Sequence, residues 1–122
     1  MSKKILYVQT SGTDTPERLY APFILASTAR AMDIGATIYF LGKGVTAVMK
    51  GNAEKIKLGS FPTVKQVMDQ AANAGVKMMV CGQSCQMLGL KGAPEEFEDP
   101  AKVVGAATLN DLVLEYDAVL TF

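Results

Sequence analysis

The sequence of 122 residues contains no histidine, and its two cysteines are Cys81 and Cys85. Without an imidazole, the chain cannot form the Cys-His or Ser-His-Asp arrangements in which histidine activates a nucleophile. A structural zinc site usually takes four cysteine or histidine ligands. Because two thiols need carboxylates or a second subunit to complete a metal site, we expect neither a metal nor a cofactor.

The sequence also lacks an excess of charge and lacks a long apolar run. Twelve basic residues balance twelve acidic ones, which argues against nucleic acid or an anionic membrane as a partner. The apolar stretch after Lys4 is far too short for a signal sequence or a membrane span. We therefore expect a cytoplasmic protein, whose thiols are kept reduced. A cysteine pair in that compartment is more often catalytic, redox-active or metal-binding than structural.

The apolar content, by contrast, is high, since 49% of the residues are hydrophobic and seven are methionine. A chain of this length is the size of one domain, so we treat residues 1–122 as a single domain. It buries about two-thirds of its unfolded surface without needing a disulfide or a metal. The apolar surplus suggests further burial between subunits, and we expect a homo-oligomer.

Short β-leaning runs alternate with helical segments along the chain, which predicts a three-layer α/β domain with a mostly parallel sheet. The expected strands cover residues 4–9, 36–41, 77–80 and 118–122, with a short edge strand at 56–58. The expected helices cover residues 15–34, 62–74 and 108–116, with shorter ones at 45–50 and 83–88. A polar loop with two prolines follows Leu90.

Threonine and proline mark the expected helix starts. Thr15 followed by Pro16 is typical of a first helical turn, although Pro22 predicts either a kink or a later beginning. Pro62 is predicted to open the next long helix. Thr108, with an acid three residues further on, resembles the capping box of a helix that begins there. Each of these helices would lie between two expected strands.

Cys81 follows an expected strand directly and precedes Gly82, which permits a sharp turn into a short helix. Ligands of open α/β sheets bind beyond the carboxyl ends of the strands, where Cys81 would lie. The unpaired N–H groups and positive dipole end of the short helix would favour a thiolate. The simpler alternative is that Cys81 is a small buried apolar residue at a strand end.

Cys85 lies four residues after Cys81, so a helical segment would place the two side chains on one face. Their Cα atoms would then be about 6 Å apart, within the range of a disulfide. A reversible bridge, or passage of sulfur from one thiol to the other, would be feasible at that separation. The alternative for Cys85 is burial against the sheet.

Four segments of the chain, taken in order, resemble a known family. They are residues 4–14 with the proline-containing helix that follows, residues 36–44, residues 80–90, and the closing helix with residues 118–122. Together they resemble the DsrE/DsrF-like family of small sulfur-handling proteins. The resemblance implies an α/β/α fold with a five-stranded sheet and cytoplasmic oligomers, often trimers or hexamers.

The resemblance also implies a role for the first thiol. In members of the family that transfer sulfur, a cysteine just after a late strand carries sulfur as a persulfide, and Cys81 matches that position. Cys85 is additional to the pattern of the sulfur-relay members. Other members lack the active cysteine, so the resemblance supports the fold more firmly than it supports catalysis.

The leading hypothesis is therefore a sulfur carrier or sulfurtransferase. Cys81 would accept sulfane sulfur and pass it to a thiol on a partner protein or to Cys85. The pocket around Cys81 would be shaped by residues from the three loops at the strand ends, namely Thr13, Asp14, Lys43, Gly82, Gln83 and Ser84. Two alternatives stay open: a non-catalytic oligomeric module that binds a small ligand, and a redox protein that cycles a Cys81–Cys85 disulfide.

Overall fold

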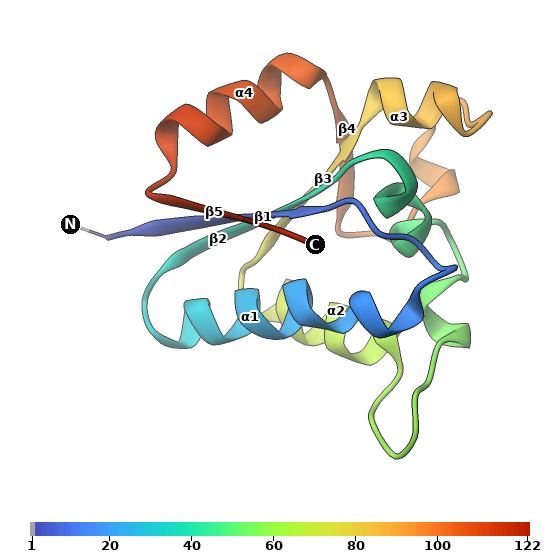
Figure 1. Cartoon of the computed structure of the whole chain (residues 1–122), viewed down its shortest axis with the longest axis horizontal. Helices are drawn as coiled ribbons and strands as arrows, with labels where there is room; N and C mark the ends of the chain where they lie inside the picture. Colours follow the sequence, from blue (N-terminus) through green and yellow to red (C-terminus); the bar gives the residue numbers. More distant parts are fainter. Residues whose placement is uncertain (1) are drawn as a thin grey trace.

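Five parallel strands in the order β4-β3-β2-β1-β5 form the centre of the computed structural model, which describes residues 2–122 (Figure 1). Their bounds are β1 Lys4–Gln9, β2 Gly35–Phe40, β3 Lys77–Cys81, β4 Ala101–Val104 and β5 Ala118–Thr121. The predicted α/β fold with a parallel five-stranded sheet is thus confirmed.

Helices cover both faces of the sheet, as Figure 1 shows. On one face lie α1 (Tyr20–Ala31) and α2 (Val64–Asn73), and α4 (Ala106–Glu115) lies on the other. The short helix α3 (Gly82–Met87) continues directly from β3. The remaining helical turns are 3-10 helices: η1 Pro16–Arg18, η2 Gly42–Val48, η3 Ala53–Lys55 and η4 Pro94–Glu96. None of the helices within residues 2–122 has both the length and the apolar character needed to cross a bilayer.

Alternate residues of each strand serve two separate apolar clusters, because successive side chains of a strand point to opposite faces. In β2, Ile38 and Phe40 belong to a large cluster beneath α1 and α2, which we call the main core. Tyr39, between them, faces the other way. It belongs to a smaller cluster beneath α4, which we call the α4-side core and which consists of Leu6, Val8, Tyr39, Cys81 and Leu112.

The fifth strand is not where the sequence analysis placed it. The prediction of an edge strand over residues 56–58 is wrong, since that segment forms only a single bridge between Lys57 and Thr63. The fifth strand is β4, within the stretch expected to be a polar loop, where it pairs with β3 in register from Met78↔Ala101 to Cys81↔Val104. Two residues of β4, Lys102 and Val103, are exposed, so this edge strand has no buried apolar run that would identify it.

Several helix boundaries also differ from the prediction. Pro16 opens only the 3-10 turn η1, and α1 begins at Tyr20 with Pro22 in its first turn, where the missing N–H breaks no helical hydrogen bond. The helix predicted to open at Pro62 begins at Val64, after a capping box of Thr63 and Gln66. The last helix begins at Ala106 rather than at Thr108, and its N-cap is Gly105. The short helix expected at residues 45–50 is the earlier 3-10 helix η2.

Candidate functional site

Cys81 lies at the junction of β3 and α3, because it is both the last residue of the strand and the N-cap of the helix. Its backbone is extended, with φ −73° and ψ 119°, and it pairs in register with Val104 of β4. The side chain therefore points to the face of the sheet that α4 covers, where it joins the α4-side core. Only 3% of the residue is exposed.

Hydrogen-bonding groups from two elements, β2 and α3, surround the Cys81 thiol. Sγ donates to Gln83 Oε1 at 3.7 Å, and in this thiol form it caps no backbone N–H. Burial works to raise the pKa of Cys81, but hydrogen bonds from Ser84, Tyr39 and the Gln83 backbone outweigh it and lower the pKa below that of an ordinary cysteine. Such donors favour a thiolate without any histidine.

Tyr39 supplies a phenol to this environment from the middle of the sheet. Its residue is fully buried, and its hydroxyl donates to the carbonyl oxygen of Gly105 at 3.0 Å. Burial, together with the neighbouring Cys81, raises the pKa of Tyr39. The phenol therefore keeps its proton at physiological pH, and its single O–H donates either to the Gly105 carbonyl oxygen or to a Cys81 thiolate.

Ser84 connects the cysteine loop to the loop after β2. It is buried in α3, and its Oγ accepts a hydrogen bond from the backbone N–H of Gly42 at 2.8 Å. The hydroxyl also contributes to the lowered pKa of Cys81. Because the Gly42 amide is part of η2, this bond fixes the position of α3 relative to the carboxyl end of β2.

The loops after β1 and β2 interlock next to α3, and two glycines make this close approach sterically possible. A Cβ on Gly44 would overlap the carbonyl oxygen of Gln9, the last residue of β1. A Cβ on Gly12 would lie 2.6 Å from both the Lys43 carbonyl oxygen and the Thr46 Oγ1 atom. The close contact between the loops after β1 and β2 therefore requires glycine at positions 12 and 44.

Cys85 lies on the other side of the site, in the main core, with only 1% of the residue exposed. The expectation that the two cysteines share a helical face is wrong, because Cys81 is extended and the helix begins at Gly82. Both thiols are free. Burial raises the pKa of Cys85, and the neighbouring Cys81 and Glu96 raise it further. Cys85 is therefore the less readily ionised thiol.

The predicted pocket residues of the first two loops form a group of their own. Lys43 Nζ pairs with Asp14 Oδ2 at 2.8 Å, and both side chains are exposed. This hydrogen bond lowers the pKa of Asp14. The backbone N–H of Thr13 donates to Thr46 Oγ1 at 3.1 Å. Among residues 2–122, no cluster of three or more histidine, cysteine or acidic residues is arranged to hold a metal.

A cavity of about 290 Å³ opens beside the cysteine loop. Of the predicted pocket residues, Gly82 and Gln83 line it, and Thr13, Asp14, Lys43 and Ser84 do not. The other lining residues, which the sequence analysis missed, are Gln86, Lys91, Gly92, Val103 and Gly105. Gln86 lies in α3, Lys91 and Gly92 lie in the loop that follows it, and Val103 and Gly105 come from the end of β4. The β-branched pair at the end of β4 was the signal that could have located the last two. Lys91 is the one charged residue of the lining.

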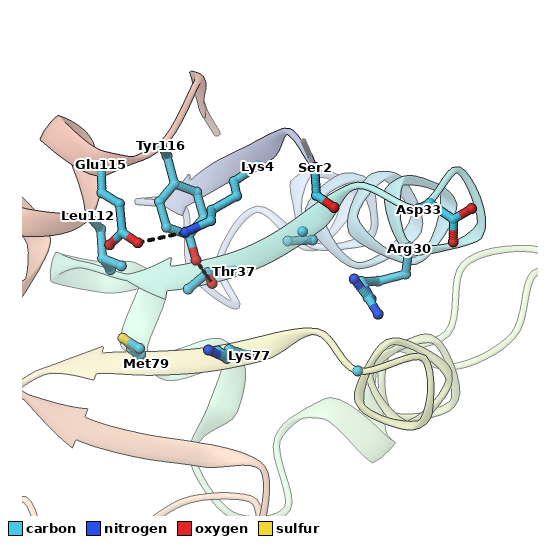
Figure 2. A pocket seen from close by; sticks show the side chains of 13 residues that line it. Ser2, Lys4, Arg30, Asp33, Thr37, Lys77, Met79, Leu112, Glu115 and Tyr116 are labelled. Carbon is cyan, nitrogen blue, oxygen red and sulfur yellow. Dashed lines mark hydrogen bonds and ion pairs between the residues drawn. The ribbon is translucent and has the colours of Figure 1, made fainter.

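A second cavity, of about 380 Å³, lies at the opposite edge of the sheet, at the start of β1, β2 and β3 (Figure 2). Four of its polar side chains form two pairs. Lys4 Nζ lies 2.6 Å from Glu115 Oε1, and the hydroxyls of Thr37 and Tyr116 are 2.5 Å apart. These pairs fasten the end of α4 to the sheet, and the lining includes no thiol.

Nearly the whole chain matches the model of a known protein family. The DsrE/DsrF-like family model matches residues 3–122 of this chain. The uncharacterized protein MJ0989 of Methanocaldococcus jannaschii is 30% identical over 122 residues, which cover 98% of this chain and 99% of that protein. The uncharacterized protein MJ0760 of the same organism is 28% identical over 105 residues, which cover 86% of this chain and 38% of that protein. This chain therefore spans well under half the length of MJ0760.

Solved structures share the fold at lower sequence identity. The YchN protein from E. coli superposes with a TM-score of 0.79 at 21% identity, and the match covers 100% of both chains. A conserved protein of unknown function from Bacteroides thetaiotaomicron, BT1422, gives a TM-score of 0.69 at 14% identity over 98% of this chain and 95% of its own. These likenesses establish the architecture of the sheet and its helices.

Proposed function

Because the chain belongs to the DsrE/DsrF-like family, we propose that it is a sulfur carrier that holds sulfane sulfur as a persulfide on Cys81 and passes it to a thiol acceptor. The observation that carries this proposal is the environment of Cys81. Cys81 is the last residue of β3, an inner strand of the sheet, and hydrogen bonds from Ser84, Tyr39 and the Gln83 backbone lower the pKa of its thiol. A reactive thiolate at the carboxyl end of a parallel sheet has the position and the charge state of a nucleophile.

The proposed reaction moves one sulfur atom without an external oxidant. The Cys81 thiolate attacks the outer sulfur of a donor persulfide, R–S–SH, and forms Cys81–S–SH. The bond between the two donor sulfurs breaks, and its electron pair leaves with R–S⁻ as a thiolate. Delivery repeats the exchange with an acceptor thiolate as the attacking group, and Cys81 is released as the leaving thiolate. The hydrogen bonds that favour the Cys81 thiolate also favour its departure.

An acceptor on a partner protein fits this site better than Cys85 does. The Cys85 thiol lies in the main core, whereas Cys81 belongs to the α4-side core. Burial also raises the pKa of Cys85 and lowers its fraction of thiolate at neutral pH. We infer a donor and an acceptor protein as partners, and the cytoplasm, where thiols stay reduced, as the place of action.

Intact mass distinguishes this function from its two alternatives. We expect the protein to gain about 32 Da, one sulfur, when it is incubated with a small persulfide donor, and to lose that mass when a dithiol is added. A loss of about 2 Da under mild oxidant, with no sulfur uptake, would identify a disulfide-cycling protein instead. No mass change under either condition would contradict both thiol functions and leave the ligand-binding module.

We also propose that the chain works as a homo-oligomer. All four residues of β5, which forms one edge of the sheet, are exposed, and they include Val119 and Leu120. Leu114 of α4 is 86% exposed, and Val113 next to it is also exposed. Apolar side chains grouped at a free strand edge and on the neighbouring helix are typical of a surface that a second subunit covers.

Sedimentation equilibrium tests this assembly. We expect a mass of at least three times the 13.0 kDa of one chain at micromolar concentration. Replacing Leu114 by aspartate should shift the equilibrium toward smaller species, since a charge there would be buried in the interface. A single 13.0 kDa species of the unmodified chain would contradict the proposal.

A further inference from the structure

Gln83 separates the Cys81 thiol from the cavity beside it. The cavity of about 290 Å³ is lined by Gln83 but not by Cys81. The amide oxygen of Gln83 accepts the thiol proton at 3.7 Å, and Cys81 is buried whereas Gln83 is exposed. A reagent that enters the cavity therefore meets the Gln83 side chain before it reaches the sulfur.

We propose that Gln83 is a positioning residue that closes the cavity over Cys81 and binds the sulfur in both of its protonation states. A primary amide can do this because one end accepts a hydrogen bond and the other end donates. The oxygen accepts from the thiol, and a half-turn of the amide presents Nε2–H to a thiolate or to the outer sulfur of a persulfide. The inference rests on the proposed function only for the persulfide; the contact with the thiol is independent of it.

The same geometry explains how a buried thiol can take part in transfer between molecules. Gln83 belongs to the first turn of α3 and is exposed, so its side chain can turn outward without disturbing either core. Such a movement joins the cavity to the sulfur. When the amide turns back, it shields the persulfide from water and from unspecific thiols, which would otherwise remove the sulfur.

Gln86 provides a matched control on the same helix. It lines the same cavity and is exposed, but its side chain makes no hydrogen bond to Cys81. The titratable groups near Cys81 are Tyr39 of β2, Cys85 of α3 and Tyr116 at the end of α4, and Lys91 lines the cavity on the far side of Gln83. The neighbouring β1 and β4 contribute only the aliphatic Leu6, Val8 and Val104. No substitution at position 83 or 86 changes any of these groups.

The test measures the alkylation of Cys81 by iodoacetamide as a function of pH, in a Cys85→Ala background that leaves one thiol. Gln83→Ala is expected to raise the plateau rate at high pH by roughly fivefold or more, because the sulfur becomes open to the cavity. Gln83→Glu keeps the size of the side chain but adds a negative charge beside the sulfur. It is expected to move the midpoint of the profile to higher pH. Gln86→Ala should match the parent in both quantities, and Gln86→Glu, whose side chain does not contact the sulfur, should move the midpoint less than Gln83→Glu does.

The midpoint is the readout that a merely structural residue would not move. If Gln83→Ala and Gln86→Ala give the same plateau rate, or if Gln83→Glu leaves the midpoint in place, the proposal is overturned. Thermal unfolding of each variant checks that the fold is retained. The sulfur-loading experiment on the unmodified chain is separate. If the unmodified chain takes up sulfur but the Gln83 variants behave like the parent, only the inference about Gln83 is contradicted. If the Gln83 variants change the alkylation profile but the unmodified chain takes up no sulfur, only the proposed carrier function is contradicted.

Discussion

Replacing Gly44 by alanine is expected to lower the free energy of unfolding by about 3 kcal/mol or more. The added Cβ would overlap the carbonyl oxygen of Gln9 and lie 2.6 Å from its carbonyl carbon. Both atoms belong to the backbone at the end of the inner strand β1, so no side-chain rotation relieves the clash. A loss of this size is a large share of the roughly 5–15 kcal/mol by which domains are stable, and urea unfolding measures it.

Gly105→Ala is the control for this prediction. Gly105 has a negative φ of −89°, and nothing lies within 4 Å of an added Cβ. Its change in unfolding free energy should stay within about 1 kcal/mol, the size of an N-cap effect. If Gly44→Ala and Gly105→Ala lower the free energy of unfolding by similar amounts, the contact between the loops after β1 and β2 does not require glycine at position 44.

The second large effect is expected in the pH dependence of the two thiols. Hydrogen bonds lower the pKa of Cys81 against the opposing effect of burial, while burial raises the pKa of Cys85. The sign follows from the ionisation, since a lowered pKa gives more thiolate at neutral pH and only the thiolate reacts. Cys81 should therefore react with iodoacetamide on the order of tenfold faster than Cys85 at pH 7.

Single-cysteine variants separate the two thiols. Cys85→Ala reports on Cys81, and Cys81→Ala reports on Cys85. The midpoint of the rate profile should lie below that of a free cysteine, about 8.5, for the first thiol and above it for the second. In a denaturant that unfolds both variants, the two profiles should coincide. A reversed order in the folded state would mean that the Cys81 environment does not favour a thiolate.

Much of the architecture could be predicted because the buried strands leave a strong signal. Residues of β1, β2 and β3 form apolar runs, since parallel strands covered on both faces are buried on both. The position of Cys81 at the end of β3 followed from the same signal. The strand β4 left no such run, because Lys102 and Val103 face outward at the edge of the sheet. The residues that this strand brings to the cavity were missed with it.

The relation between the two cysteines shows a different limit. A spacing of four residues places two side chains on one face only when both residues are helical. The helix begins at Gly82, one residue after Cys81, so Cys81 keeps its extended backbone. Its thiol therefore lies in the α4-side core, whereas the thiol of Cys85 lies in the main core. Sequence patterns locate helix ends only to within a few residues. The side of the sheet to which a side chain points at a strand-to-helix junction can therefore be determined only from the structure.

The pairing of Lys43 with Asp14 illustrates a third limit. Both residues follow expected strands and were correctly placed in loops at one edge of the sheet. Lys43 Nζ and Asp14 Oδ2, however, form an ion pair at 2.8 Å, and neither group contributes to the lowered pKa of Cys81. The groups that affect the Cys81 thiol are instead the hydroxyls of Tyr39 and Ser84 and backbone N–H groups, which carry no charge and give no signal in the charge pattern.

The most direct test of the central claim is to locate the transferred sulfur within the chain. After loading with a small persulfide donor and capping with iodoacetamide, trypsin should release residues 78–91, which contain both cysteines, because Lys77 and Lys91 flank them. Fragmentation of this peptide should place the additional mass of about 32 Da on Cys81 and leave Cys85 with the cap alone. Cys81→Ser should take up no sulfur, and Cys85→Ser should take up one. An extra sulfur on Cys85, or uptake by Cys81→Ser, would contradict the account.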